Sequence, residues 1–223
     1  ARGVCKALEE ELHSLDRMQM ADVDDVRILP VEPIGYSPEH MDFEGSKTLS
    51  YEAALGRWIS IGEQLSALGV RRFLLLNAHG GNSPLVSLVC QELRVRCNML
   101  AVGTKWDRFI DEIEVGRTER IYGIHAGRIE TSVMLWIAPE DVQMKQALDY
   151  PSLQQTLNEN FRHLQAYGPH AFGRMLLDLN SSGVTGMASR ATAEEGGKLV
   201  HRAAVGLCEL LHDMLDFRLS WLK

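Results

Sequence analysis

The sequence lacks features that would assign it to several common protein classes. It has four cysteines, at 5, 90, 97 and 208, and no two of them form a CxxC pair. It has no apolar run near the roughly 18 residues that cross a bilayer, and its net charge of -7 leaves no positive excess. We therefore expect reduced, mostly buried thiols in a cytoplasmic protein that binds neither nucleic acid nor membrane.

Two nucleotide-binding motifs, GxGxxG and GxxxxGK[ST], are also missing, and no internal repeat or low-complexity linker divides the chain. The 223 residues are 45% hydrophobic and 24% charged. This length and composition suit a large α/β domain with a well-covered sheet. We expect residues 1–223 to form a single domain.

The stretch FLLLNAHGGN at 73–82 is the centre of the prediction. Its apolar half suits a parallel strand that is covered on both faces. Its polar half is a glycine-rich turn that contains His79, and Ser83 followed by Pro84 is typical of a helix start with Ser as the cap. A strand, a turn and a helix in this order form the crevice where open α/β sheets bind ligands.

Flanking segments extend this unit into a parallel, doubly wound sheet. We expect strands at 26–30 and 99–102 and helices at 50–69 and 84–96, the first of them capped by Ser50. The β-α-β-α-β order predicts right-handed parallel connections. Lys105 and Trp106 then lie at the carboxyl edge of the sheet, beside His79. Trp106 is either a pocket wall or a core residue.

Two segments between these elements suggest functional loops. The loop 31–46 carries Ser37-Pro38-Glu39-His40-Met41, and its aromatic residues favour an ordered loop. His40 is either a pocket residue or a solvated surface side chain. The charged, weakly patterned segment 107–123 is typical of a lid or an oligomer contact.

The stretch IHAGRIETSVMLWI at 124–137 predicts a helix that begins near Arg128. Glu130 would share a face with the apolar residues Val133, Met134 and Ile137. A carboxylate on an apolar stripe needs a partner, either a cation such as Arg128 or a metal ion. His79 and His125 can each be explained as supporting residues, but together with Glu130 they are the ligand types of a zinc or manganese hydrolase.

The last third of the chain predicts two further helices, at 151–167 and after Thr192. Thr192 and Glu195 would form a capping box for the second. The buried stripe of that helix is Leu199, Ala203, Leu207, Leu210 and Met214.

Four segments in this order and spacing closely resemble the creatininase (creatinine amidohydrolase) family. They are FLLLNAHGGN at 73–82, IHAGRIETSVML at 124–135, YSPEHMDFEGSKTLS at 36–50, and SGVTG at 182–186 followed by ATAE at 191–194. The resemblance implies a three-layer α/β/α fold with a mostly parallel sheet. It also implies a metal-dependent amidohydrolase with two divalent metal ions, zinc, manganese or iron, assembled as a homo-oligomer such as a hexamer.

The resemblance also implies roles for individual residues. His79 binds metal, Glu130 binds metal and orients the attacking water, and His125 transfers a proton. Gly81 stands where creatinine-cleaving members carry Glu, which favours another small polar substrate, a cyclic amide or a formamide, cleaved at a C–N bond. Arg128 stands where relatives often carry Glu.

Five residues are candidate substrate contacts. The backbone N–H groups of Gly80 and Gly81 would steady an oxyanion. The other three are His40, Asn82 and Trp106.

One expected segment has no counterpart in the sequence. The family begins with a strand and an E-x-H-G-x-H-x-P-x-x-x-D segment that supplies metal ligands, whereas this sequence opens at Ala1 within an amphipathic pattern over 4–15. We expect a longer natural protein that carries the segment. One alternative is a catalytically silent scaffold or binding subunit without metals, and another is a phosphate or nucleotide binder that uses the turn at Gly80 and Gly81.

Overall fold

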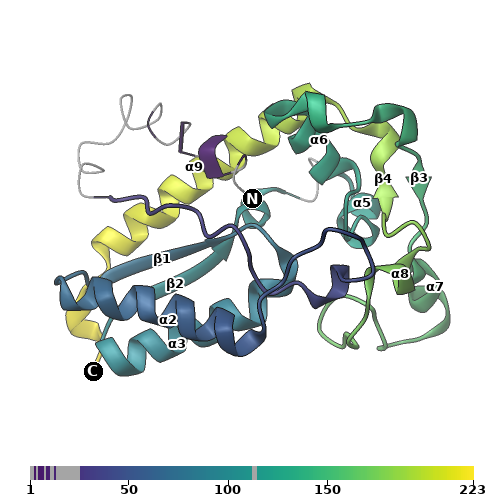
Figure 1. The fold of residues 1–223 in the computed structure, drawn as a ribbon. Coiled ribbons are helices and arrows are strands. Elements are labelled where there is room, and N and C mark those ends of the chain that lie inside the picture. The colour runs from purple at the N-terminus through teal and green to yellow at the C-terminus, as the bar shows by residue number, and fades with distance from the viewer. Residues whose placement is uncertain (1–2, 4, 8, 11–12, 14–25, 112–114) are drawn as a thin grey trace. The chain divides into compact units, whose positions relative to one another are not determined.

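The computed structural model describes residues 3, 5–7, 9–10, 13, 26–111 and 115–223 (Figure 1). The amphipathic pattern predicted over 4–15 lies largely outside these residues. Contacts divide the chain into two compact units. Unit 1 consists of 1–37, 47–109 and 203–223, and unit 2 of 38–46 and 110–202.

The described elements alternate helices, short 3-10 turns and strands. The α-helices are α2 (Tyr51–Ala67), α3 (Ser83–Cys97), α5 (Arg117–Tyr122), α6 (Arg128–Ile137), α7 (Leu153–Asn160), α8 (Leu176–Leu179) and α9 (Ala193–Asp216). The strands are β1 (Arg72–Asn77), β2 (Leu100–Lys105), β3 (Asp149–Tyr150) and β4 (Gly186–Met187). The 3-10 turns that bear on the site are Pro38–His40, Gly80–Asn82 and Trp106–Phe109.

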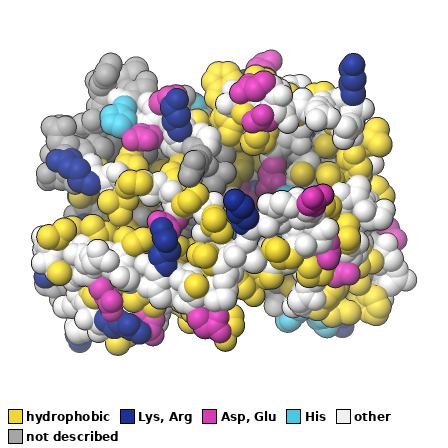
Figure 2. Space-filling view, in the orientation of Figure 1, with side chains coloured by type: hydrophobic (Ala, Val, Ile, Leu, Met, Phe, Trp, Pro, Cys, Tyr) yellow, Lys and Arg dark blue, Asp and Glu magenta, His cyan; other side chains and the backbone are white. Residues whose placement is uncertain are grey.

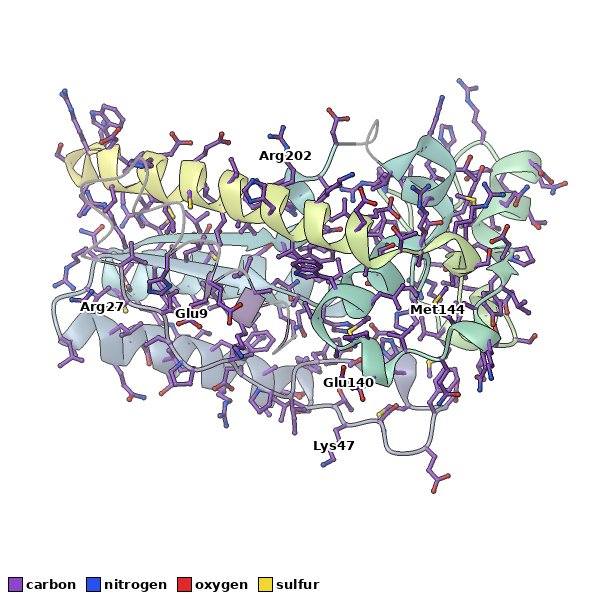
Figure 3. All side chains as sticks on the ribbon, turned by 90° about the horizontal axis from the view of Figure 1, so that it is seen from above. Glu9, Arg27, Lys47, Glu140, Met144 and Arg202 are labelled. Atoms are coloured by element: carbon purple, nitrogen blue, oxygen red, sulfur yellow. The ribbon has the colours of Figure 1, made fainter. Side chains whose placement is uncertain are left out.

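Unit 1 has three layers, with β1 and β2 between α2 and α3 on one face and the second half of α9 on the other (Figures 1 and 3). Successive side chains of β1 alternate between the layers, as the two-residue period of a strand requires. Phe73 and Leu75 pack against α2 and α3, whereas Leu74 and Leu76 pack against Leu207 of α9. The predicted α/β fold with helices on both faces of a parallel strand pair is therefore confirmed.

Strands β1 and β2 run parallel and end together. Arg72 pairs with Leu100 at one end and Asn77 with Lys105 at the other. The turn after β1 and the turn after β2 therefore leave the same edge of the sheet. The predicted position of Lys105 at the carboxyl edge is confirmed.

Helices α2 and α3 approach each other closely because Gly62 has no side chain. A Cβ atom at Gly62 would lie 2.4 Å from the methyl groups of Leu93, which is fully buried. Ser50 caps α2 as predicted, since its side chain accepts a hydrogen bond from the Ala53 N–H group.

Some predicted elements of unit 1 are wrong. Residues 26–30 form no strand and lie in irregular backbone. Ser83 is not a cap but the first residue of α3, and Asn82 is the cap, although its side chain accepts no hydrogen bond from the first turn of the helix. Tertiary contacts explain the second error, because the Ser83 hydroxyl instead accepts a hydrogen bond from the Asn77 side chain at 3.3 Å.

Unit 2 combines short helices with an antiparallel pair, in which Asp149 pairs with Met187 and Tyr150 with Gly186. The predicted helix at 151–167 is shorter, because α7 covers Leu153–Asn160, and Ser152 caps it. The capping box at the start of α9 is half formed. Thr192 accepts the Glu195 N–H group at 3.2 Å, but the Glu195 carboxylate binds Arg128 and Ser132.

The surface carries charges of both signs. Acidic and basic side chains are interspersed among apolar ones on the face drawn in Figure 2. Among the described residues, none of the helices combines the length and the apolarity that crossing a bilayer requires.

Candidate functional site

In unit 1, the side chain of Asn77 fixes the turn that carries His79. Asn77 is buried at the end of β1, and its Oδ1 accepts the His79 N–H group at 3.0 Å and the Asn82 side-chain amide at 3.3 Å. The Asn82 Oδ1 in turn accepts the Tyr36 N–H group at 2.9 Å. These hydrogen bonds hold the 3-10 turn Gly80–Asn82 between the strand and α3.

Two neighbouring features of unit 1 bear on the predicted substrate contacts. A Cβ atom at Gly80 would meet nothing within 4 Å, so the backbone at this position is open to a ligand. Trp106 is buried with 6% of its surface exposed, which supports the core reading of this residue. Lys105 and Asp107 on either side of it form an ion pair at 3.1 Å.

In unit 2, the turn before α6 holds His125 next to a left-handed residue. Ala126 has a φ angle of 51°, a region that residues with a Cβ atom adopt at a cost. Its N–H group donates to Glu130 Oε2 at 2.6 Å, and its carbonyl accepts the Thr131 hydroxyl at 3.0 Å. These two bonds offset the cost and fix the direction in which His125 leaves the turn.

Four side chains of unit 2 gather around this turn, and we call them the His40–His125 cluster: Glu39, His40, His125 and Glu130. Glu130 Oε2 lies 3.7 Å from His125 Nδ1, and Glu39 Oε1 lies 3.8 Å from His40 Nδ1. The two imidazole rings meet edge to face with centroids 4.7 Å apart. Each imidazole therefore has a carboxylate beside its Nδ1 atom, and a carboxylate next to an imidazole is the arrangement of a proton-transferring histidine.

The guanidinium group of Arg174 interacts electrostatically with Glu39 of this cluster. Burial lowers the pKa of the Arg174 guanidinium, while the charge of Glu39 raises it. Arg174 also donates through Nε to the Ala166 carbonyl at 3.0 Å. The positive charge of Arg174 therefore interacts favourably with the negative charge of Glu39.

The environment of Glu130 differs from the predicted one. Its side chain is 48% exposed, and the buried residues of α6 are Ile129, Ser132 and Val133. The predicted apolar stripe is wrong because α6 is rotated so that Glu130 reaches back toward the turn. Arg128 is not its partner either, since Arg128 pairs with Glu195.

The structure brings some predicted site residues together within one unit. His40, His125 and Glu130 meet in unit 2, whereas His79, Gly80, Gly81, Asn82 and Trp106 belong to unit 1. The joint role of His79 and Glu130 as metal ligands involves both units and stays a prediction. Sequence reasoning missed Glu39, although Ser37-Pro38-Glu39 is a turn signal that places this carboxylate next to His40.

The donor chemistry of these residues fits a divalent metal ion. His79 offers an imidazole nitrogen in unit 1, and the His40–His125 cluster offers imidazole nitrogens and carboxylate oxygens in unit 2. Nitrogen and oxygen donors of this kind suit zinc and manganese.

Comparisons with known proteins agree with this reading. The sequence profile of the Creatininase family, described as creatinine amidohydrolase, matches residues 1–211. No curated protein matches the chain.

Solved structures share the fold. A putative creatinine amidohydrolase from Bacteroides fragilis NCTC 9343 has a TM-score of 0.70 at 23% identity, with 95% of this chain and 80% of that chain covered. A creatinine amidohydrolase (creatininase) has a TM-score of 0.68 at 22% identity, covering 96% and 81%. A creatininase described with Mn has a TM-score of 0.66 at 21% identity, covering 94% and 79%. With a family match over most of its length and this common fold, the chain belongs to the creatininase family.

Proposed function

We propose that this protein is a metal-dependent amidohydrolase that cleaves the C–N bond of a small polar amide, either a cyclic amide or a formamide. The observation that carries the proposal is the His40–His125 cluster, in which a carboxylate lies beside each of two contacting imidazoles. A chain of the creatininase family with such a pair has a group that can move a proton at the scissile nitrogen.

His125 is the proton donor in this proposal. Glu130, at 3.7 Å from His125 Nδ1, favours a proton on that nitrogen and stabilises the charged ring. His40 contacts the ring edge to face and limits its rotation. The leaving nitrogen then receives its proton from the ring in a fixed direction.

Metal binding falls to His79 and Glu130 in this proposal. When bound, divalent ions supply Lewis acidity and an activated water at neutral pH. The chain itself fixes the His79 backbone through Asn77 and leaves the Gly80 backbone open, so that N–H groups of this turn can bind the carbonyl oxygen of the substrate. Gly81, where creatinine-cleaving relatives carry Glu, favours a substrate other than creatinine.

The test uses the complete natural protein, loaded with Zn²⁺ or Mn²⁺ and incubated with creatinine, dihydrouracil, hydantoin and N-formylglycine. Release of the ring-opened or deformylated product is measured by mass spectrometry. We expect turnover of at least one amide and a loss of about 100-fold or more in His125→Gln. His163→Gln, which changes an exposed histidine outside the cluster, is the control.

Metal content separates this proposal from its alternatives. His79→Ala should release metal and abolish hydrolysis. A complete protein that binds neither zinc nor manganese would instead support a silent scaffold, and thermal protection by nucleotides but by none of the amides would support a phosphate binder.

Assembly is the remaining part of the proposal. We expect a homo-oligomer, as the family resemblance implies, and light scattering of the complete protein at micromolar concentration measures it. A monomer at that concentration would contradict this expectation.

A further inference from the structure

Thr185 holds the backbone of His125 on both sides. Its hydroxyl accepts the N–H groups of Ile124 at 3.0 Å and His125 at 3.2 Å, and its own N–H group donates to the His125 carbonyl at 2.9 Å. Thr185 has no exposed surface. Water therefore cannot replace the hydroxyl as an acceptor without a local opening of the structure.

The Glu119 side chain also accepts backbone hydrogen bonds next to this turn. It is 1% exposed, and its two carboxylate oxygens accept the N–H groups of Arg128 at 2.6 Å and Met187 at 2.8 Å. Arg128 begins α6, whose cap residue Gly127 has no side chain to offer. The Glu119 carboxylate thus takes the place of a helix cap and joins the His125 segment to the Thr185 segment.

Glycines allow the His125 segment and the Thr185 segment to pack too closely for a side chain to fit between them. A Cβ atom at Gly127 would lie 2.3 Å from Glu119 Oε1 and 2.7 Å from the Thr185 carbonyl oxygen. Gly186 has a φ angle of 104°, and its Cβ atom would lie 2.7 Å from the Cα atom of Gly123. The two segments therefore pack backbone against backbone, which makes the position of His125 sensitive to the side chains between them.

We propose that Thr185, supported by Glu119, is a positioning residue that sets the His125 imidazole for proton transfer. The inference rests on the proposed function for the role of His125, and it gives a role to the segment SGVTG at 182–186. Without the hydroxyl, the two part-buried N–H groups of Ile124 and His125 lose their acceptor, and the turn must move to satisfy them. A shift of about 1 Å in a catalytic group costs on the order of 100-fold in rate.

The test compares Thr185→Val, which keeps the shape but removes the hydroxyl, with Thr185→Ser, which keeps the hydroxyl. In the complete metal-loaded protein, kcat and KM are measured on the amide that the wild type hydrolyses best, together with metal content. Hydrogen–deuterium exchange of the peptide 121–130 is followed in parallel. Thr156→Val makes the same chemical change at an exposed position of α7 and serves as the control.

We expect Thr185→Val to lower kcat by about 10- to 100-fold with KM within about 3-fold. Metal content should stay unchanged, and exchange should accelerate in peptide 121–130. Thr185→Ser should recover kcat to within about 5-fold of the wild type. If Thr185→Val does not fold, Thr185→Cys takes its place, because a thiol is a similar-sized but weak acceptor.

A kcat within 3-fold of the wild type in Thr185→Val, or equal losses in the Val and Ser variants, would overturn the inference. A wild-type protein that hydrolyses none of the amides would overturn the proposed function instead. Hydrogen–deuterium exchange would then test whether the Thr185 hydroxyl holds the backbone of His125. Faster exchange in the Val variant but not in the Ser variant supports this role, and unchanged exchange in both variants overturns it.

Discussion

Arg128 and Glu195 form a paired contact in which Arg128 Nη2 lies 2.6 Å from Glu195 Oε1 and Arg128 Nε donates to Glu195 Oε2 at 2.8 Å. The side chains are 29% and 14% exposed, and the Ser132 hydroxyl also donates to Glu195 at 3.0 Å. This pair gives the positive charge of Arg128 a carboxylate partner within unit 2. Here the first residue of α6 binds the first turn of α9.

Removing either side chain of the Arg128–Glu195 pair should lower the free energy of unfolding, and the two losses should not be additive. Arg128→Met leaves the part-buried Glu195 with Ser132 alone, and we expect it to lower the free energy of unfolding by about 2 kcal/mol. The double variant Arg128→Met with Glu195→Met should lose less than the sum of the single losses. Urea unfolding of the four proteins measures the coupling, and strict additivity would show that the pair contributes nothing specific.

Local sequence patterns correctly predicted the elements whose conformation depends mainly on their own residues. The apolar run at 73–76, the cap at Ser50 and the start of α6 at Arg128 are all confirmed. Such signals depend on neighbours within one turn or one strand, which a sequence displays directly.

The roles of Glu119 and Thr185 were beyond the reach of such patterns. Glu119 looks like one more charge in the charged segment 107–123, yet it is buried because it receives N–H groups from residues 9 and 68 positions away. Thr185 contacts a turn 60 residues earlier. Pairings at this distance depend on the path of the chain, which single-sequence periodicity does not contain. The exposure of Glu130 was mispredicted for the same reason.

Asn77 should affect both stability and metal binding, because it fixes the backbone of His79. Asn77→Leu removes the acceptor for the His79 N–H group, and we expect a loss of about 2 kcal/mol in unfolding free energy. Zinc affinity of the complete protein should fall by about 10- to 100-fold, the usual effect of losing a residue that orients a ligand. Calorimetric titration with Zn²⁺ measures the affinity. Asn160→Leu, at an exposed site, is the control, and equal affinities of the two variants would contradict the role of Asn77.

Ala126 should tolerate glycine but not a β-branched residue, since its φ angle is 51°. Ala126→Val should lower the midpoint of thermal unfolding and cost about 2 kcal/mol, because a branched Cβ is poorly accommodated in the left-handed region. Ala126→Gly should be within about 0.5 kcal/mol of the wild type or more stable. Ala147→Val tests the same change at a φ angle of -75°, where no such penalty applies. Similar losses at both alanines would mean that packing, not backbone strain, limits position 126.

Arg72 should contribute far more to the free energy of unfolding than its neighbour Arg71, because Arg72 binds the end of α9. The Arg72 guanidinium donates to the carbonyls of Met214, Leu215 and Phe217 at 2.6, 3.2 and 3.1 Å. Met214 and Leu215 lie in the last turn of α9, where helix carbonyls have no partners further along the helix, so Arg72 acts as a C-terminal cap. We expect Arg72→Met to lower the unfolding free energy by about 2 kcal/mol and Arg71→Met by about 0.5 kcal/mol, because the Arg71 contacts are exposed. Urea unfolding measures both, and equal losses would rule out the capping role.

The Cys90 thiol should contribute less to the free energy of unfolding at alkaline pH than at neutral pH. Burial raises the pKa of its thiol, outweighing a backbone hydrogen bond that lowers it. Its side chain packs against the buried cluster of α2 and α3. Because the folded state favours the neutral thiol, this contribution is fully present below the pKa of the unfolded chain, about 8.5 for an ordinary thiol, and is lost as pH rises through the folded pKa. The advantage of the wild type over Cys90→Ala in unfolding free energy should therefore be constant between about pH 6 and pH 8 and shrink as the pH rises above the pKa of an ordinary thiol. Urea unfolding of both proteins across this range isolates Cys90 from the tyrosines and lysines that titrate in both. An advantage that stays flat to pH 11 would show that the thiolate is tolerated in the folded chain.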